Sequence, residues 1–173
     1  ISDLNEALHK PLETVESNIA GTIKILQACK LNKVKRFIFA SSIYVYSKQG
    51  GFYRCSKQAA ENYIEEFSKT YSQNYTILRY GSIYGPRSNL SNGIYRIIFN
   101  AIKNKTLQYN GNKETIREYI HVYDIARMSE QILQKKFVNK CITLTGSNKI
   151  YAKDLMNIMK EIFNIKKIKF LNK

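Results

Sequence analysis

The sequence predicts an α/β fold built on a parallel sheet. The strand expected at Val34 to Ala40 is almost unbroken and apolar after Lys35-Arg36, as in a central parallel strand covered on both faces. A helical pattern follows from Phe52 to Tyr71, and then a β-branched and aromatic strand from Thr76 to Tyr80. Strand, loop, helix and strand in this order indicate an α/β sheet, whose ligands bind beyond the carboxyl ends of the strands.

The other elements are predicted from apolar spacing and from turn residues. Residues Ile1 to Leu12 give no clear pattern, whereas Glu13 to Lys30 has helical spacing. Gly81 to Asn92 is rich in glycine, serine and asparagine and is expected to be a loop at the carboxyl end of a strand. The expected later elements are a helix at Ile94–Ile102, strand, turn and strand across Leu107–Tyr109 and Thr115–Ile120, a helix at Ile125–Gln134 capped by Asp124, a strand at Cys141–Thr145, a helix from Tyr151 and a strand or tail at Ile168–Leu171.

Composition indicates a globular protein in a reducing, cytoplasmic setting. The net charge of +15 comes from 28 Lys and Arg against 13 acidic residues. Because the lysines are scattered or paired, we favour solvated surfaces over a nucleic-acid interface, and we expect no nucleic-acid partner. The three cysteines are far apart in the sequence, and their odd number does not suggest a set of disulfide pairs. They also lack metal-ligand spacing, so no metal is expected. No apolar run approaches the roughly 20 residues needed to span a bilayer, and no signal peptide is visible, so no membrane partner is expected.

The candidate chemistry lies in Ser42, Tyr53 and Lys57. Ser42 follows the apolar strand, and Tyr53 and Lys57 are four residues apart at the start of the next helix, so they share one helix face. A nearby ammonium should lower the pKa of the Tyr53 phenol toward neutrality. This group could move a proton on or off an alcohol or sugar hydroxyl while a cofactor takes the hydride. Tyr-x-x-x-Lys alone would fit an amphipathic helix with an exposed lysine, but the preceding strand and serine pair favour the functional interpretation.

Four motifs follow one another along the chain: Ser41-Ser42-Ile43-Tyr44-Val45-Tyr46, Tyr53-x-x-x-Lys57, Leu78-Arg79-Tyr80-Gly81-Ser82-Ile83-Tyr84-Gly85-Pro86-Arg87 and Arg117-Glu118-Tyr119-Ile120-His121-Val122-Tyr123-Asp124. In this order they resemble the extended short-chain dehydrogenases/reductases, in the branch of NAD-dependent nucleotide-sugar epimerases and dehydratases. The resemblance implies the carboxyl-terminal portion of a Rossmann-like doubly wound parallel sheet plus a small α/β substrate-binding part. Residues 1–81 would form a partial NAD-binding domain, and residues 82–173 mostly the substrate-binding part, with some segments returning to the Rossmann sheet.

The resemblance also implies roles for individual residues. Ser42, Tyr53 and Lys57 would be catalytic. The cofactor would be NAD, with NADP as the alternative, and the residues that would contact it are Asn18, Ala40, Ser41, Tyr53, Lys57 and Tyr80. The nucleotide-sugar substrate would contact Ser82, Arg87 and Arg117, with Arg117 on the diphosphate and Arg87 either on the pyrophosphate or merely solvated.

Three features depart from the family pattern. The eight glycines include no glycine-rich dinucleotide turn, and the chain would enter the fold just before its fourth strand. The interval from Ser42 to Tyr53 is eleven residues, about half the usual length. Ser82 stands where relatives often carry an asparagine. We therefore expect a fragment of a longer enzyme or one half of a split enzyme, and an exposed sheet edge at Phe37 to Phe39 that favours self-association or a partner chain.

The implied function is epimerisation of a nucleotide sugar: Tyr53 takes the hydroxyl proton, NAD takes the ring hydride, and the keto intermediate is reduced on its other face. A 4-keto sugar nucleotide reductase or a dehydratase is the alternative, although Ile43 and Tyr44 replace the acidic residues that dehydratases place after the strand hydroxyl. A non-catalytic remnant or subunit of a split enzyme is a third. The expected assembly is a homodimer of the full enzyme, or a complex with a partner that supplies the amino-terminal half.

Overall fold

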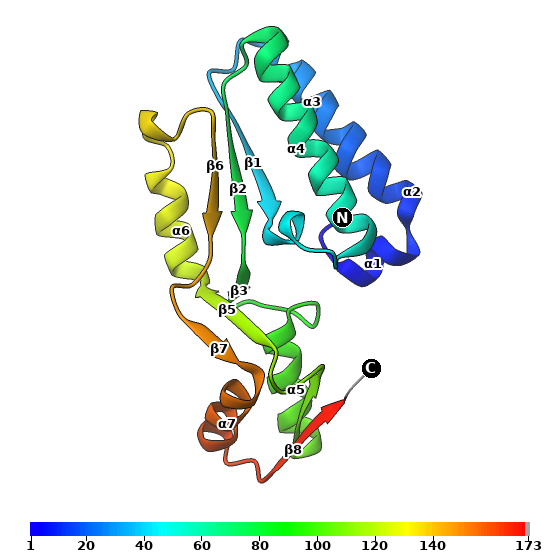
Figure 1. The fold of residues 1–173 in the computed structure, drawn as a ribbon, viewed down its shortest axis with the longest axis vertical. Helices are drawn as coiled ribbons and strands as arrows, with labels where there is room; N and C mark the ends of the chain where they lie inside the picture. Colours follow the sequence, from blue (N-terminus) through cyan, green and yellow to red (C-terminus); the bar gives the residue numbers. More distant parts are fainter. Residues whose placement is uncertain (172–173) are drawn as a thin grey trace. The chain divides into compact units, whose positions relative to one another are not determined.

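The computed structural model describes residues 1–171 and divides into two compact units (Figure 1). Unit 1 comprises Ile1–Tyr80 and Met128–Leu144. Unit 2 comprises Gly81–Arg127 and the chain from Thr145 onward. Each unit is therefore assembled from two separate segments of the chain.

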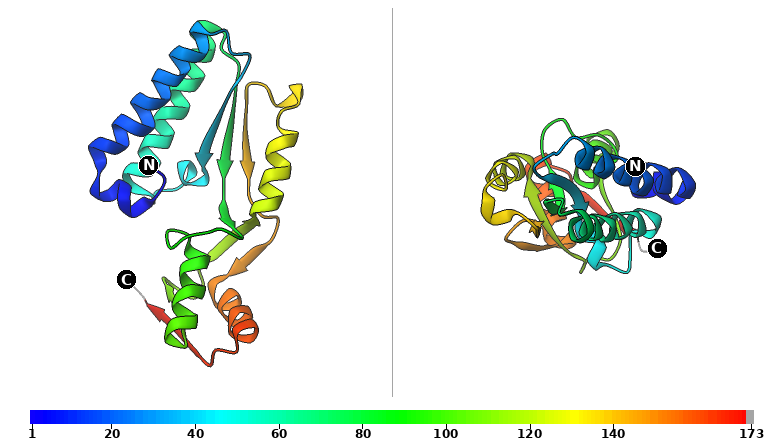
Figure 2. Two further views of the ribbon diagram at one scale, coloured as in Figure 1. Left: turned by 180° about the vertical axis from the view of Figure 1, so that it is seen from behind. Right: turned by 90° about the horizontal axis from the view of Figure 1, so that it is seen from above.

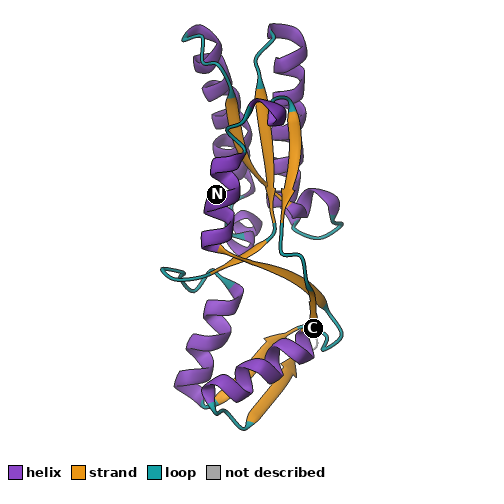
Figure 3. Ribbon diagram, turned by 90° about the vertical axis from the view of Figure 1, so that its left-hand side faces the viewer, coloured by secondary structure: helices purple, strands orange, loops and turns teal. Residues whose placement is uncertain are grey.

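Unit 1 contains a parallel sheet in the order β1-β2-β6, formed by β1 (Phe37–Ser42), β2 (Tyr75–Tyr80) and β6 (Lys140–Leu144). The three strands run side by side in Figure 3. Among the described strands β1 lies at an edge of this sheet, as expected from the sequence. The parallel sheet and its helices confirm the α/β class.

Two long helical segments lie alongside each other next to β1 (Figure 2). They are α3 (Gly21–Leu31) and α4 (Gly51–Tyr71). Burial of apolar side chains is the main force that holds such helices on a sheet. The core between them contains Leu26 from α3, Ala60 and Ile64 from α4, and Phe39 and Ile77 from β1 and β2.

The helix predicted at Glu13 to Lys30 is a nearly continuous run of three segments: α2 (Pro11–Thr14), a π-helical segment (Val15–Ala20) and α3. A proline at the first helical position is favourable because its missing N–H would have no intrahelical partner. Before α2 lies α1 (Leu4–His9). The Asp3 carboxylate caps its first turn by accepting hydrogen bonds from the Asn5 and Glu6 backbone N–H groups.

Unit 2 contains two small sheets and covering helices. One sheet has the order β3-β5-β7, with β3 parallel and β7 antiparallel to β5. The other pairs β4 and β8 in parallel. The bounds are β3 (Ser82–Tyr84), α5 (Gly93–Asn104), β4 (Thr106–Asn110), β5 (Ile116–His121), β7 (Lys149–Tyr151), α7 (Ala152–Phe163) and β8 (Lys167–Leu171). Helix α6 (Val122–Gln131) begins in unit 2, and its residues from Met128 onward belong to unit 1.

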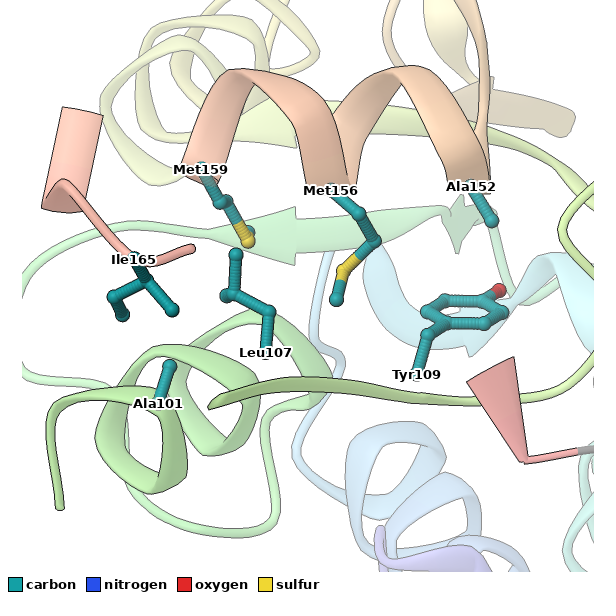
Figure 4. Close-up of a cluster of buried hydrophobic side chains, with 7 residues drawn as sticks. All are labelled: Ala101, Leu107, Tyr109, Ala152, Met156, Met159 and Ile165. Carbon is teal, nitrogen blue, oxygen red and sulfur yellow. The ribbon is translucent and has the colours of Figure 1, made fainter. Parts of the chain in front are cut away.

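The core of unit 2 lies between α5, α7 and strand β4 (Figure 4). Leu107 and Tyr109 alternate with exposed or half-buried residues along β4, so one face of the strand is apolar. Met156 and Met159 of α7 and Ala101 of α5 are buried against them. Methionine is suited to such irregular gaps because its side chain is flexible.

Two local predictions in unit 2 were wrong, the loop at Gly81 to Asn92 and the cap by Asp124. The predicted loop contains strand β3. The predicted strand, turn and strand are confirmed as β4 and β5, which pair with other strands and not with each other. Residues of the connection between them bond to α7: the Ala152 and Lys153 N–H groups donate to the Thr115 and Lys113 carbonyls.

Asp124 does not cap the helix that follows it. Helix α6 begins at Val122, so Asp124 lies within the first turn, where its carboxylate accepts a 2.7 Å hydrogen bond from Arg127. The backbone N–H of Tyr123 instead donates to His121 Nδ1 at 3.3 Å.

No helix in the described part of the chain is long and apolar enough to cross a membrane.

Candidate active site

The carboxyl end of β1 and the first turns of α4 bring Ser42, Tyr53 and Lys57 together in unit 1. Ser42 is the last residue of β1, is 7% exposed, and its Oγ accepts a hydrogen bond from the Tyr44 N–H at 3.3 Å. The Tyr53 phenol lies close enough to the Ser42 hydroxyl for that hydroxyl to influence its pKa. Strand end and helix start thus present a hydroxyl and a phenol to each other.

Lys57 is anchored on the same strand end. Its ammonium donates to the Ala40 carbonyl at 2.9 Å and lies 4.7 Å from the centroid of the Phe39 ring. The Tyr53 ring centroid is 5.8 Å away. An ammonium carries three donors, and the structure gives this one a single hydrogen-bond acceptor among the described residues.

Asn18 is buried and braces the helix that carries Tyr53. Its Nδ2 donates to the Ser56 hydroxyl at 3.0 Å, and that hydroxyl donates to the Tyr53 carbonyl at 2.8 Å. A second bond from Asn18 Nδ2 reaches the Ile1 carbonyl at 2.9 Å. At 8% exposed, Asn18 is not the solvent-facing asparagine that its helix position alone would suggest.

A short loop joins the serine strand to the tyrosine helix. It contains a 3₁₀ turn at Ile43–Tyr46 and reaches α4 through Gly50, whose φ of 99° lies in the left-handed region. A side chain at position 50 would also meet the Tyr44 ring. Glycine is therefore required there by both conformation and space, and it allows the connection between Ser42 and Tyr53 to be as short as it is.

The predicted lowering of the Tyr53 pKa was wrong for this structure. Burial raises the pKa of the phenol above its ordinary value of 10.0, the hydrogen bond with Ser42 lowers it, and Tyr44 raises it. Desolvation prevails because the Lys57 ammonium is directed to the Ala40 carbonyl rather than to the phenol oxygen. Burial also lowers the pKa of Lys57, and the Glu61 carboxylate raises it.

The lowered Lys57 pKa predicts a pH-dependent contribution to stability. The folded protein binds the Lys57 proton less tightly than the unfolded chain does. The contribution of neutral Lys57 to the free energy of unfolding is therefore fully present above pH 10.5, and it is lost as pH falls through the pKa of the folded state. The free energy of unfolding of wild type minus that of Lys57→Met should therefore rise from neutral pH to about 10. The raised Tyr53 pKa acts with the opposite sign at higher pH, but Tyr53 is present in both proteins, so its contribution cancels in the difference. Urea unfolding across this range measures the difference, and a pH-independent difference would contradict the prediction.

Ser41 and Tyr80, two predicted cofactor contacts, have protein partners in this structure. The Ser41 hydroxyl donates to the Glu61 carboxylate at 2.5 Å, and Ser41 is 4% exposed. The Tyr80 hydroxyl shares a 3.2 Å hydrogen bond with the Ser129 hydroxyl. Ala40 is exposed and offers its carbonyl to Lys57.

The three predicted substrate contacts lie in unit 2. Ser82 begins β3 and is paired with Tyr119 of β5. Arg87 is exposed in the following loop with a φ of 63°, and Arg117 is exposed on β5 beside Ile150 of β7. A hollow of about 320 Å³ in the same unit is lined by Lys105, Lys166 and Lys167 among others, and by none of these three residues.

Sequence reasoning missed a buried carboxylate next to the site. Glu61 lies one helical turn after Lys57 and is 5% exposed. It forms an ion pair with Arg79 of β2 at 2.6 Å. A charged residue inside an otherwise apolar strand requires a buried partner, so Arg79 was the signal that could have led to Glu61.

Lys57 and Tyr53 leave hydrogen-bonding groups available in unit 1. The remaining N–H groups of Lys57 and the Tyr53 phenol could bind hydroxyl groups such as those of a ribose. The sequence contains no glycine-rich turn of the kind that binds a pyrophosphate in this fold. Within the described residues, no three His, Cys, Asp or Glu side chains gather closely enough to hold a metal ion.

Comparison with curated proteins finds relatives among nucleotide-sugar enzymes. The chain is 26% identical to a UDP-glucuronate 4-epimerase of Thermodesulfobacterium geofontis, covering 96% of this chain and 56% of that protein. It is 25% identical to a putative UDP-glucose 4-epimerase of Methanocaldococcus jannaschii, covering 91% and 57%. It covers 42% of a dTDP-D-glucose 4,6-dehydratase of Dictyostelium discoideum at 25% identity. The chain thus spans about half the length of these relatives or less.

Solved structures share the fold. A UDP-glucuronic acid 4-epimerase from Bacillus cereus, in complex with NAD, superposes with a TM-score of 0.84 at 25% identity, covering 91% of this chain and 56% of that one. A UDP-glucose 4-epimerase from Thermotoga maritima, with UDP-glucose, gives a TM-score of 0.87 at 24% identity, covering 99% and 61%.

The family model for the NAD dependent epimerase/dehydratase family matches residues 1–142, which is most of the chain. Motifs, fold and relatives agree. The chain belongs to the NAD-dependent epimerase/dehydratase family of extended short-chain dehydrogenases/reductases, and it is homologous to nucleotide-sugar epimerases and dehydratases over much of their chains.

Proposed function

We propose that the protein takes part in the epimerisation of a UDP-sugar, with Ser42, Tyr53 and Lys57 as its catalytic residues. The observation that carries the proposal is the position of the Tyr53 phenol, close to Ser42 and beside the Lys57 ammonium that is fixed on the end of β1. The UDP-sugar 4-epimerases among the relatives support this substrate class.

Each side chain has a distinct task. Tyr53 accepts the proton of the reacting sugar hydroxyl and later returns it. Ser42 hydrogen-bonds the same oxygen and keeps it in line with the phenol. Lys57 holds its ammonium 5.8 Å from the centroid of the Tyr53 ring, where its remaining N–H groups can donate to the ribose hydroxyls of the cofactor. NAD, when bound, would supply the acceptor for the hydride of the sugar carbon, and its reduced form would return that hydride.

Two other reactions would use the same residues. A 4-keto sugar nucleotide reductase needs the phenol as a proton donor and consumes reduced cofactor with each turnover. A dehydratase needs an acid and a base for elimination, and Ile43 and Tyr44 directly after Ser42 supply neither a carboxylic acid nor a carboxylate. The ring of Tyr44 instead packs edge-on against Tyr53 at 6.3 Å between centroids.

The test is to incubate the complete protein with NAD and with UDP-glucose or UDP-glucuronate, and to follow the 4-epimers by NMR. Inversion at the sugar carbon without net use of the cofactor is expected. Stoichiometric loss of NADH or NADPH with a 4-keto substrate would assign a reductase instead. Binding of UDP-sugars without any conversion would assign a non-catalytic role.

Arg117 provides a separate test of the substrate class. A guanidinium can hold a diphosphate through paired hydrogen bonds, so Arg117→Ala should raise the dissociation constant for UDP about tenfold or more, since hydrogen bonds to charged groups contribute about 1.5–3 kcal/mol. Because the side chain is exposed, stability should change little.

The matched control for Arg117→Ala is Arg127→Ala. Arg127 is also an exposed arginine of unit 2, and its partner is Asp124. Calorimetric titration of both variants with UDP measures the effect. Equal affinity in the two variants would assign Arg117 to the solvated surface.

A further inference from the structure

The buried carboxylate of Glu61 stands at the centre of a hydrogen-bonded network behind the candidate active site. It accepts from the Ser41 hydroxyl at 2.5 Å, and from Arg79 Nε at 3.1 and 3.2 Å and Nη2 at 2.6 Å. This arrangement raises the pKa of the Arg79 guanidinium, chiefly through the hydrogen bond with Glu61. A charged pair with this geometry fixes side-chain directions more firmly than apolar contacts do.

From Arg79 the network continues to Tyr46, in the turn that follows β1. Arg79 Nη1 donates to the Tyr46 hydroxyl at 2.6 Å, and the guanidinium lies 4.8 Å from the centroid of the Tyr46 ring. The Tyr46 hydroxyl also shares a 3.2 Å hydrogen bond with Thr143 of β6. Tyr46 ends the 3₁₀ turn that begins directly after Ser42.

Ser42 is therefore held from both sides. On one side its neighbour Ser41 is bonded to Glu61, and on the other the turn is bonded through Tyr46 to Arg79. Ala40, one residue before Ser41, carries the carbonyl that anchors Lys57. Glu61 is on the same helix as Tyr53 and Lys57, one turn further on, so the network joins the helix of the phenol to the strand of the hydroxyl.

We propose that Glu61 is a positioning residue, which acts through Ser41 and Arg79 to hold the end of β1 and helix α4 at the spacing that Ser42, Tyr53 and Lys57 require. Stability alone does not explain the network, because apolar residues of similar volume often replace a buried ion pair without loss. The kinetic part of this inference rests on the proposed function, and its spectroscopic part does not.

The first test compares Glu61→Gln with Glu66→Gln in the complete protein. Glu66 lies on the same helix, is exposed and pairs only with Lys69 and Thr70 among the described residues, so it controls for the loss of one carboxylate. For Glu61→Gln we expect kcat to fall about 10–100-fold, as for other residues that orient an active-site group, with KM within about twofold. Loss of the carboxylate should also lower the pKa of Lys57, measured by NMR, because Glu61 raises it.

Glu61→Gln leaves the Arg79 charge without its partner and could reduce folding. The double variant Glu61→Met with Arg79→Met removes the whole pair and should fold cooperatively, with a reduced kcat. It should also shift the NMR signals of the Tyr53 ring and the Lys57 side chain. A folded double variant with wild-type kcat and unchanged Tyr53 and Lys57 signals would overturn the inference.

The two proposals can fail separately. If the wild-type protein converts no nucleotide sugar, the proposed function fails, and the NMR signals of Tyr53 and Lys57 still test whether Glu61 positions them. If the wild type turns over and the double variant does so equally well, the network is structural and the function stands.

Discussion

Replacing Tyr53 by phenylalanine should lower kcat about 10²–10⁴-fold, because general base catalysis contributes that much to a rate. The change deletes one oxygen atom and leaves the ring in its contact with Tyr44. The phenylalanine ring fills the space of the tyrosine ring, so the variant should keep the fold. Thermal unfolding followed by circular dichroism checks that point.

Tyr63→Phe is the matched control for Tyr53→Phe. Tyr63 lies on the same helix, carries the same phenol and is 48% exposed. Its replacement should change kcat by less than about twofold, as for a surface side chain away from the chemistry. Equal activity of the two variants would remove Tyr53 from the proposed mechanism.

Replacing Ile77 by alanine should destabilise the protein by about 2–5 kcal/mol, the range for such truncations in a well-packed core. Ile77 is fully buried at 0% exposed on the middle strand of the unit 1 sheet. It packs with Leu26 and Ile64, so the cavity would open between the sheet and both long helices. This is a large part of the total stability of about 5–15 kcal/mol typical of a domain.

Ile38→Ala tests whether burial is the cause. Ile38 lies on the adjacent strand β1 and is 38% exposed. The substitution Ile38→Ala therefore removes the same atoms as Ile77→Ala, but from a partly solvated position. Urea unfolding should show a loss clearly smaller than that of Ile77→Ala. Similar losses at both positions would mean that the sheet is covered differently from the structure described here.

The order of elements in unit 1 could be predicted because its local and global signals agree. The apolar run before Ser42, the helical spacing from Phe52 to Tyr71 and the β-branched strand that follows each specify one structure. Their positions at the carboxyl end of β1 also predicted that Ser42 and Tyr53 would meet. Periodicity suffices for these elements because each contributes apolar side chains to the core between the sheet and the long helices.

Unit 2 was harder to predict because its strand partners are distant in sequence. Leu107 and Tyr109 pair with residues of β8, some sixty positions later, and not with the nearby Thr115 to Ile120 segment. Short strands such as Ser82–Tyr84 and Lys149–Tyr151 are defined by their neighbours and carry little pattern of their own.

The electrostatics of the site could not be predicted from spacing alone. Tyr53 and Lys57 do share a helix face, but the direction of the Tyr53 pKa depends on burial and on where the ammonium is directed. The role of Glu61 likewise depends on Arg79, which is eighteen positions away in sequence and adjacent in space. Such terms follow from packing, which the sequence pattern does not contain.

The most direct measurement of the central proposal follows hydrogen at the inverted carbon. The complete protein, NAD and a UDP-sugar are incubated in deuterium oxide, and the epimer is analysed by NMR and mass spectrometry. If Tyr53 moves only the hydroxyl proton while the carbon-bound hydrogen is transferred and returned as hydride, the epimer carries no deuterium at that carbon. Deuterium at the inverted carbon would show exchange with solvent through proton abstraction from carbon and would contradict the proposed mechanism.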